Sequence, residues 1–148
     1  MNTFFLRAAI RKFKSLFRAS SQPVQADASK FGDPYLKELL GAGLHQLGFV
    51  YKTKSALSRV IPKIPCLALG DLSDSSSGYP LTVNLNVVRL LKSRGWVTDH
   101  KMKPLGKDTF VVKYTNETKG LVLSQVVVFD SSSEDNKTRI KYAEVYIQ

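Results

Sequence analysis

The C-terminal third of the sequence constrains the fold most, because strand-like segments there are separated only by short polar turns. In the first segment, DTFVVKYT, alternation places Phe110, Val112 and Tyr114 on one face. The segments GLVLSQVVVFD and TRIKYAEVYI follow, with turns NETKG and SSSEDNK. Short turns between consecutive strands favour antiparallel hairpins. We therefore expect an antiparallel meander, with a bulge where the apolar alternation slips near Ser124 and Gln125.

A helix is predicted upstream, in the stretch FGDPYLKELLGAGLHQLGF. Asp33 is expected to cap its N-terminus, and Pro34 suits the first helical position. Gly48 is a natural C-terminal stop. Gly41 and Gly43 each cost the helix up to about 1 kcal/mol, which indicates close packing against a neighbour. Leucines at helical spacing form the apolar stripe: Leu36, Leu39, Leu40, Leu44 and Leu47.

The middle of the chain connects these two parts. In LTVNLN, residues 81–86, strict alternation predicts a strand with Leu81, Val83 and Leu85 on the core side. The next stretch, VVRLLKSRG, changes to helical spacing and ends at Gly95. The predicted fold class is therefore α+β, a single compact domain over residues 32–148, with N-terminal helices followed by the antiparallel β meander.

Length and charge limit the partners of such a domain. The chain has 148 residues, of which 43% are hydrophobic, enough for one domain with a real core. No apolar run approaches the roughly 20 residues that span a bilayer. The net charge of +10 favours nucleic acid, anionic lipid or an acidic protein as partner. The single cysteine, Cys66, excludes an internal disulfide and a cysteine-based zinc site.

The first 19 residues are predicted to form a basic amphipathic helix, joined to the domain by a polar linker at residues 20–31. No acidic residue occurs before Asp27. Helical spacing of about 3.6 residues per turn places most apolar side chains on one face and most basic ones on the other. The residues predicted to bind membrane are Phe5, Arg7, Arg11, Phe13, Lys14, Phe17 and Arg18.

Three interpretations of this segment compete. As a membrane foot, its apolar face enters the headgroup boundary and each basic residue contributes about 1 kcal/mol on anionic lipid. As a cleavable mitochondrial presequence, it is Arg-rich and free of acids, and Arg18-Ala19-Ser20-Ser21 resembles a matrix-processing context. As an ordinary helix it packs on the domain, although the linker composition argues against that.

A second basic region lies between residues 89 and 107, where only Asp99 and Asp108 oppose the positive charge. It is predicted to bind RNA phosphates or another anion, although no nucleic-acid-binding motif is present. Trp96 has two possible roles, stacking on a base or filling the core. The candidate residues are Arg89, Lys92, Arg94, Trp96, Lys101 and Lys103.

No catalytic arrangement is found in the sequence. The two histidines, His45 and His100, are isolated, and Cys66 is predicted to be a buried small hydrophobe. Residues 41–43, GAG, lack the strand and the third glycine of a dinucleotide-binding fingerprint. We therefore predict a non-enzymatic protein that uses no cofactor and no metal.

A short motif adds a partner hypothesis. Tyr79-Pro80-Leu81 is similar to the Tyr-Pro-x-Leu motifs by which viral structural proteins recruit host budding machinery. The alternative is that Pro80 simply begins a strand, a position where proline is common.

The layout of the chain resembles the small matrix proteins of negative-strand RNA viruses. The residues that carry this resemblance are the tail FLRAAIRKFKSLFR, the polar linker, the basic α+β domain and the YPLT stretch. The Pro-Pro-x-Tyr motif common in such tails is absent, since DPY at 33–35 has one proline. The resemblance implies a layer protein of the virion or the cytoplasmic membrane face that binds membrane, self-associates and binds a nucleocapsid. The alternatives are a mitochondrial protein and an RNA-binding accessory protein.

Overall fold

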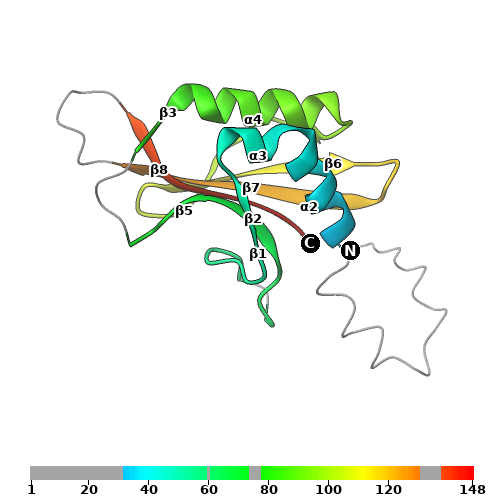
Figure 1. The fold of residues 1–148 in the computed structure, drawn as a ribbon, viewed down its shortest axis with the longest axis horizontal. Coiled ribbons are helices and arrows are strands. Elements are labelled where there is room, and N and C mark those ends of the chain that lie inside the picture. The colour runs from blue at the N-terminus through cyan, green and yellow to red at the C-terminus, as the bar shows by residue number, and fades with distance from the viewer. Residues whose placement is uncertain (1–31, 60, 74–77, 131–137) are drawn as a thin grey trace.

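The fold is an antiparallel β-sheet with helices packed on one of its faces (Figure 1). The computed structural model describes residues 32–59, 61–73, 78–130 and 138–148. The helices are α2 (Asp33–Leu39), the π-helical turn η2 (Leu40–Leu44), α3 (His45–Leu47) and α4 (Leu81–Ser93). The strands are β1 (Val50–Lys52), β2 (Cys66–Gly70), β3 (Tyr79–Pro80), β4 (Val97–Thr98), β5 (Lys103–Gly106), β6 (Thr109–Asn116), β7 (Leu121–Asp130) and β8 (Arg139–Ile147).

The strand order confirms the predicted α+β class and the C-terminal meander. The sheet runs β1-β2-β8-β7-β6-β4, with β3 added to β8 and β5 added to β6. Every pairing is antiparallel, as expected for hairpins with short turns. Strand β2 pairs with the C-terminal strand β8, so the upstream half of the chain completes the sheet that the meander begins.

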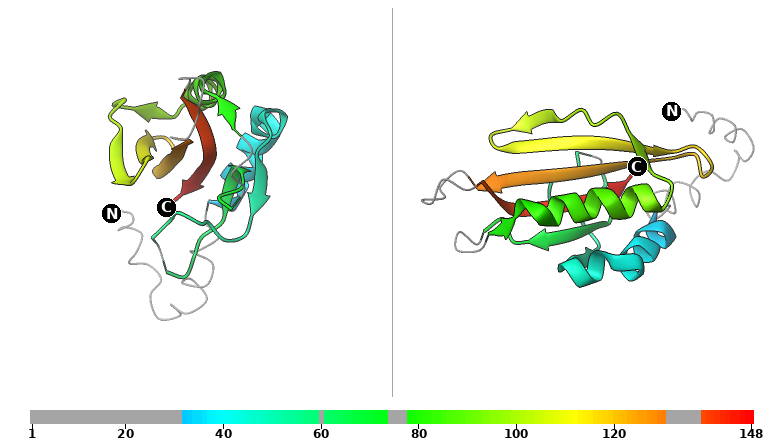
Figure 2. Two further views of the ribbon diagram at one scale, coloured as in Figure 1. Left: turned by 90° about the vertical axis from the view of Figure 1, so that its left-hand side faces the viewer. Right: turned by 90° about the horizontal axis from the view of Figure 1, so that it is seen from above.

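Successive side chains along each strand point to opposite faces of the sheet, and both faces are covered by other parts of the chain. The first face, which carries Tyr114 and Leu123, packs against the helices and holds the larger core. Figure 2 shows α4 running along the strands over the middle of this face, with α2 and α3 beside it. The second face, which carries Val111, Val126 and Tyr142, holds a smaller core under the segment of residues 53–65. Because both faces are covered, β7 is buried at every position from 123 to 127.

The predicted helix at 33–48 forms in three parts. Its N-cap is Gly32, so the prediction that Asp33 is the cap is wrong by one residue. The Asp33 carboxylate instead accepts a hydrogen bond from the Tyr51 hydroxyl, at 2.9 and 3.0 Å from its two oxygens. Gly48 ends the helix at φ +108°, as predicted. Gly43 lies against Leu90 of α4, where an added Cβ would be 3.4 Å from that side chain.

The prediction of a strand at residues 81–86 is wrong, because these residues form the first turns of α4. Pro80 has an extended backbone and precedes the first helical residue. Val87 and Leu91 are buried against the sheet and Val83 is half-buried, a spacing of four residues that continues the helical pattern of the later stretch. Leu85 therefore lies on the outer face of a helix and not on the core side of a strand.

The bulge predicted near Ser124 and Gln125 is also misplaced. Strand β7 pairs in regular register there, and its register against β8 shifts between Val128 and Phe129. The polar Gln125 is tolerated on the buried face because it has polar partners. Its amide oxygen accepts a hydrogen bond from the Tyr114 hydroxyl at 2.6 Å, and its amide nitrogen donates to the Asn84 side chain at 2.5 Å.

Candidate membrane and anion interface

The outer face of α4 carries an exposed stripe that is apolar at one end and basic at the other. Leu81 and Leu85, one turn apart, are 43% and 53% exposed. Arg89 follows at the same spacing and Lys92 lies one further turn along, both exposed. We call these four residues the α4 stripe. Leucines beside cations are the side chains that an interfacial membrane contact requires.

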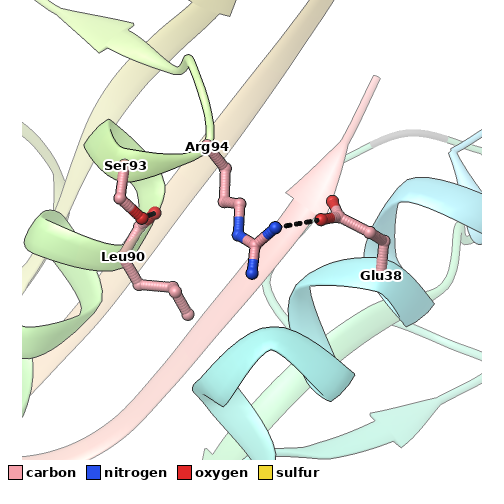
Figure 3. A network of polar contacts seen from close by, with 4 residues as sticks. All are labelled: Glu38, Leu90, Ser93 and Arg94. Atoms are coloured by element: carbon pink, nitrogen blue, oxygen red, sulfur yellow. Dashed lines mark hydrogen bonds and ion pairs between the residues drawn. The ribbon is translucent and has the colours of Figure 1, made fainter.

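The C-terminal end of α4 is tied to the neighbouring helix. The Arg94 guanidinium lies 3.3 Å from the Glu38 carboxylate of α2, and the Ser93 hydroxyl donates to the Leu90 carbonyl (Figure 3). Both charged side chains are 46% exposed, so this ion pair contributes at most about 1 kcal/mol to stability. Arg94 is thus partly neutralised and is a weaker candidate for binding an anion than Arg89 and Lys92.

Trp96 fills the core and does not face solvent. It is 3% exposed and belongs to the larger hydrophobic cluster. Gly95, at φ +90°, reverses the chain after α4 and directs Trp96 inward. Of the two roles considered for Trp96, the core role is therefore confirmed and stacking on a nucleic-acid base is wrong.

The loop after β4 extends the basic end of the α4 stripe. Lys92 Nζ lies 3.2 Å from His100 Nε2, and the exposed Lys101 follows directly. His100 has a φ of +63°, and its backbone N–H donates to the Thr98 hydroxyl. This loop therefore places the His100 ring against Lys92 and carries the exposed Lys101.

Lys103 does not belong to this group. It pairs with Val111 in the register between β5 and β6, and paired residues of adjacent strands point to the same face. Val111 belongs to the smaller core on the second face, so Lys103 also lies there, away from α4. The sheet therefore separates Lys103 from Arg89 and Lys92, which lie on α4.

The Tyr79-Pro80-Leu81 segment is built into the sheet and the helix. Tyr79 and Pro80 form β3, which pairs with Ile140 and Arg139 of β8. Tyr79 is half-buried against the larger core, close to Gly70. Of the three residues, only Pro80 and Leu81 are exposed, and Leu81 belongs to the α4 stripe.

The chemical groups of the described residues make no catalytic or metal arrangement that we recognise. His45 is exposed, and Cys66 is fully buried. Burial, together with the negative charge of Glu144, raises the pKa of the Cys66 thiol to about 12, so the thiolate nucleophile does not form near neutral pH. In the same part of the chain, no group of three or more His, Cys, Asp or Glu side chains could hold a metal ion.

The most polar buried site was not found from the sequence. Glu144 on β8 is 0% exposed, and its carboxylate accepts hydrogen bonds from the Ser55 and Tyr142 hydroxyls at 2.5 and 2.6 Å. The backbone N–H groups of Ala56 and Leu57 also donate to it, at 2.6 and 3.3 Å. Strand alternation does not indicate that the segment of residues 53–65 covers the face of the sheet that carries Glu144.

The predicted membrane-binding residues of the amphipathic helix, from Phe5 to Arg18, lie outside the described residues, as does the linker. Within the described ranges, none of the helices has both the length and the hydropathy to cross a bilayer. No family model, curated protein or solved structure matches this chain. The resemblance to viral matrix proteins therefore stays a prediction, and function is inferred from the residues of the chain itself.

Proposed function

We propose that this chain is a non-catalytic, matrix-like protein that binds anionic membrane surfaces, with the α4 stripe as one of its contacts. The observation that carries the proposal is the arrangement of exposed Leu81 and Leu85 in line with Arg89 and Lys92 on one helix. Apolar side chains entering the headgroup boundary and cations on the lipid phosphates are complementary interactions at a single surface.

The size of this contact indicates reversible binding that needs a second anchor. Each cation near an anionic surface contributes about 1 kcal/mol. Burying the exposed halves of Leu81 and Leu85 adds roughly 1 kcal/mol each. The sum of a few kcal/mol is marginal alone, and stable peripheral binding usually takes two signals. In this proposal, the amphipathic segment of residues 1–19 supplies the second signal.

Lipid explains the α4 stripe better than RNA does. A nucleic-acid backbone has phosphates for Arg89 and Lys92 but no partner for the leucines beside them. Sequence-tolerant binding of single strands uses exposed aromatic side chains as stacking platforms, and Trp96 is buried. RNA binding is therefore an outcome of the test below and not part of the proposal.

The test is co-sedimentation of the full chain with phosphatidylcholine vesicles, with and without phosphatidylserine. The double variant Arg89→Gln/Lys92→Gln removes two cations, about 2 kcal/mol, which corresponds to roughly 30-fold weaker binding. Raising the salt concentration should release the wild-type chain, because exposed charges are screened. The matched control is Lys52→Gln/Lys54→Gln, which removes the same charge from exposed residues in and just after β1.

Equal losses in the two double variants would show that net charge alone drives binding and would contradict the proposed site. Undiminished binding by Arg89→Gln/Lys92→Gln would contradict it as well. If that variant keeps its vesicle binding but loses affinity for single-stranded RNA, the function of the α4 stripe is the RNA alternative. Neutralising Arg7, Arg11 and Lys14 together tests the second anchor separately, on an otherwise unchanged chain.

A further inference from the structure

One flank of α4 is turned away from α2 and α3. On this flank, the Asn84 side chain accepts a hydrogen bond from the Gln125 amide of β7 at 2.5 Å. Further along the same flank, Lys92 lies against His100 in the loop after β4. The opposite flank carries Leu90, which lies against η2. The flank of Asn84 and Lys92 therefore faces the side of the sheet that holds β6 and β4.

Three apolar side chains share this flank, because they lie at helical spacing from Asn84 and Lys92. Leu81 and Leu85 are 43% and 53% exposed, and Val88 is half-buried. Figure 2, in the view from above, shows β6 on this side of α4 with no described helix over it. Within the described residues, the flank is thus an apolar helix surface without a helical partner.

Half-buried aromatic side chains of the sheet lie beside the start of this flank. β3 leads directly into α4, and its residue Tyr79 aligns through Ile140 of β8 with Phe129 of β7. The ring centroids of Phe129 and Phe110 are 5.8 Å apart, and both side chains are half-buried. Phe110 shares the first face of the sheet with Tyr114, since both lie on β6 at even spacing. We call five residues the docking surface: Leu81, Leu85, Val88, Phe110 and Phe129.

We infer that the amphipathic segment of residues 1–19 docks its apolar face on this docking surface when no membrane is present. The predicted apolar face carries Phe5, Phe13 and Phe17 over about 18 Å of helix, which matches the roughly 20 Å length of α4. The segment lies outside the described residues. Two features of the described domain select it as the occupant: the docking surface is apolar, and the chain enters the domain close to it.

The first described residue lies within reach of the docking surface. A Cβ added to Gly32 would be 2.7 Å from Ile147 Cβ, so the chain enters the domain at the end of β8. The register places Ile147 in one row with Tyr114, two strands away, a width of about 10 Å. Phe110 lies roughly 13 Å from Tyr114 along β6. The linker of residues 20–31 spans up to roughly 40 Å when extended, so its length allows this docking.

Docking competes with membrane binding, a consequence that rests on the proposed function. Leu81 and Leu85 belong to both the docking surface and the α4 stripe, so they cannot contact the segment and lipid at the same time. A tethered segment acts at an effective concentration on the order of 1 mM, so a weak contact is enough to keep it docked. The membrane binds only the undocked chain, and the apparent affinity falls in proportion to the undocked fraction.

The test of docking is paramagnetic relaxation enhancement in the ¹⁵N-labelled full chain without membranes. A nitroxide is attached at Ser15→Cys, which helical spacing places off the apolar face. Native Cys66 does not react, because it is buried and the pKa of its thiol is raised. We expect the amide signals of Val88 and Phe110 to be lost. The signal of Lys54, in the segment that covers the second face, should stay.

Two double variants of the segment separate docking from charge. Phe13→Asp/Phe17→Asp removes the apolar contact and should restore the lost signals. Arg11→Gln/Lys14→Gln is the matched control on the polar face and should leave them lost. Signals that persist across the docking surface would overturn the inference, as would equal recovery in the two double variants. Signal loss in ¹⁵N-labelled chain mixed with unenriched nitroxide-labelled chain would place a second copy's segment there and would also overturn it.

Vesicle binding tests the competition. Phe110→Ser and Val88→Gln each weaken the docking surface and leave the α4 stripe unchanged. If one tenth of the free chain is undocked, each variant should bind phosphatidylserine vesicles up to about ten-fold more tightly. Val97→Ser, at an exposed position on β4, is the control and should bind like the wild type. Equal binding by all three variants would contradict the competition. A chain that docks but binds no vesicles refutes the proposed function alone, so the two claims fail separately.

Discussion

The Glu144 carboxylate on β8 accepts a 2.5 Å hydrogen bond from the hydroxyl of Ser55, a residue 89 positions earlier in the chain. The same carboxylate binds the backbone of Ala56 and Leu57 and the Tyr142 hydroxyl. Through these contacts a single buried anion fastens the segment of residues 53–65 over the second face of the sheet. The smaller core, which includes Ile64 and Cys66, depends on that cover.

Replacing this carboxylate should loosen the cover. Glu144→Gln replaces one acceptor oxygen with an amide NH₂ group, which would face the N–H and O–H groups that now donate to the carboxylate. We therefore expect a loss of about 2–3 kcal/mol in the free energy of unfolding. Tyr142→Phe removes one donor and leaves the carboxylate with three others, so about 1 kcal/mol is expected. Urea denaturation followed by circular dichroism measures both. A Glu144→Gln variant as stable as the wild type would show that the carboxylate does not hold the segment.

Trp96 should behave as a core residue in mutagenesis. Trp96→Ala removes a large buried side chain, and we expect a loss of about 3–5 kcal/mol in the free energy of unfolding. The adjacent Val97 is 65% exposed, so Val97→Ala is the control and should change stability by less than about 0.5 kcal/mol. A stable Trp96→Ala variant with altered RNA or lipid binding would return Trp96 to the surface role.

The class of the fold and the C-terminal meander could be predicted because alternation and short turns are local signals. The first two turns of α4 were wrongly predicted as a strand. Over so short a segment, the apolar residues Leu81, Val83 and Leu85 fit both a strand and a helix. Only the burial of Val87 and Leu91 against the sheet decides between them, and that is a tertiary interaction.

The candidate sites show the same limit. The exposed cations Arg89 and Lys92 were recognised from composition alone. The separation of Lys103 from these two cations depends on the register between β5 and β6. The sequence does not specify that register, because β4 and β5 both pair with β6.

Alkaline pH should destabilise the protein through its buried phenols. Burial raises the pKa of Tyr51 and of Tyr114 to about 12. It also raises the pKa of Tyr142 and of Tyr146. In the unfolded chain these phenols ionise near pH 10, so the unfolded state binds fewer protons above that pH. Their contribution to stability is therefore complete below about pH 10 and is lost as the pH rises toward about 12.

The lowered pKa of Lys113 has the opposite effect. Between that lowered pKa and about 10.5, the unfolded chain binds more protons at this lysine than the folded protein does, so the stability of the fold rises with pH. The raised pKa of Cys66 adds to the tyrosines. Urea midpoints at about pH 8, 10 and 11 should fall above pH 10, and phenolate absorbance should rise together with unfolding. A midpoint that stays constant to pH 11, with all phenols ionising in the folded protein, would contradict this assignment.

The N-terminus separates the membrane-foot interpretation from the presequence interpretation. The proposal predicts that the protein recovered from its native cell keeps Met1 and the basic residues from Arg7 to Arg18. Intact mass measurement and N-terminal sequencing decide this. A mature protein that begins near Ser21 would support mitochondrial import and would remove the second anchor from the account.

The most direct test of membrane binding through the α4 stripe is fluorescence quenching at position 85. Leu85→Cys can be labelled selectively at neutral pH, because native Cys66 is buried and the pKa of its thiol is raised. Lys54→Cys, labelled in the same way on the cover of the second face, is the reference. With phosphatidylserine vesicles that contain brominated acyl chains, the account predicts strong quenching of the label at position 85 and little at position 54. Equal quenching at the two positions, or none at position 85 when the chain is fully bound, would contradict it.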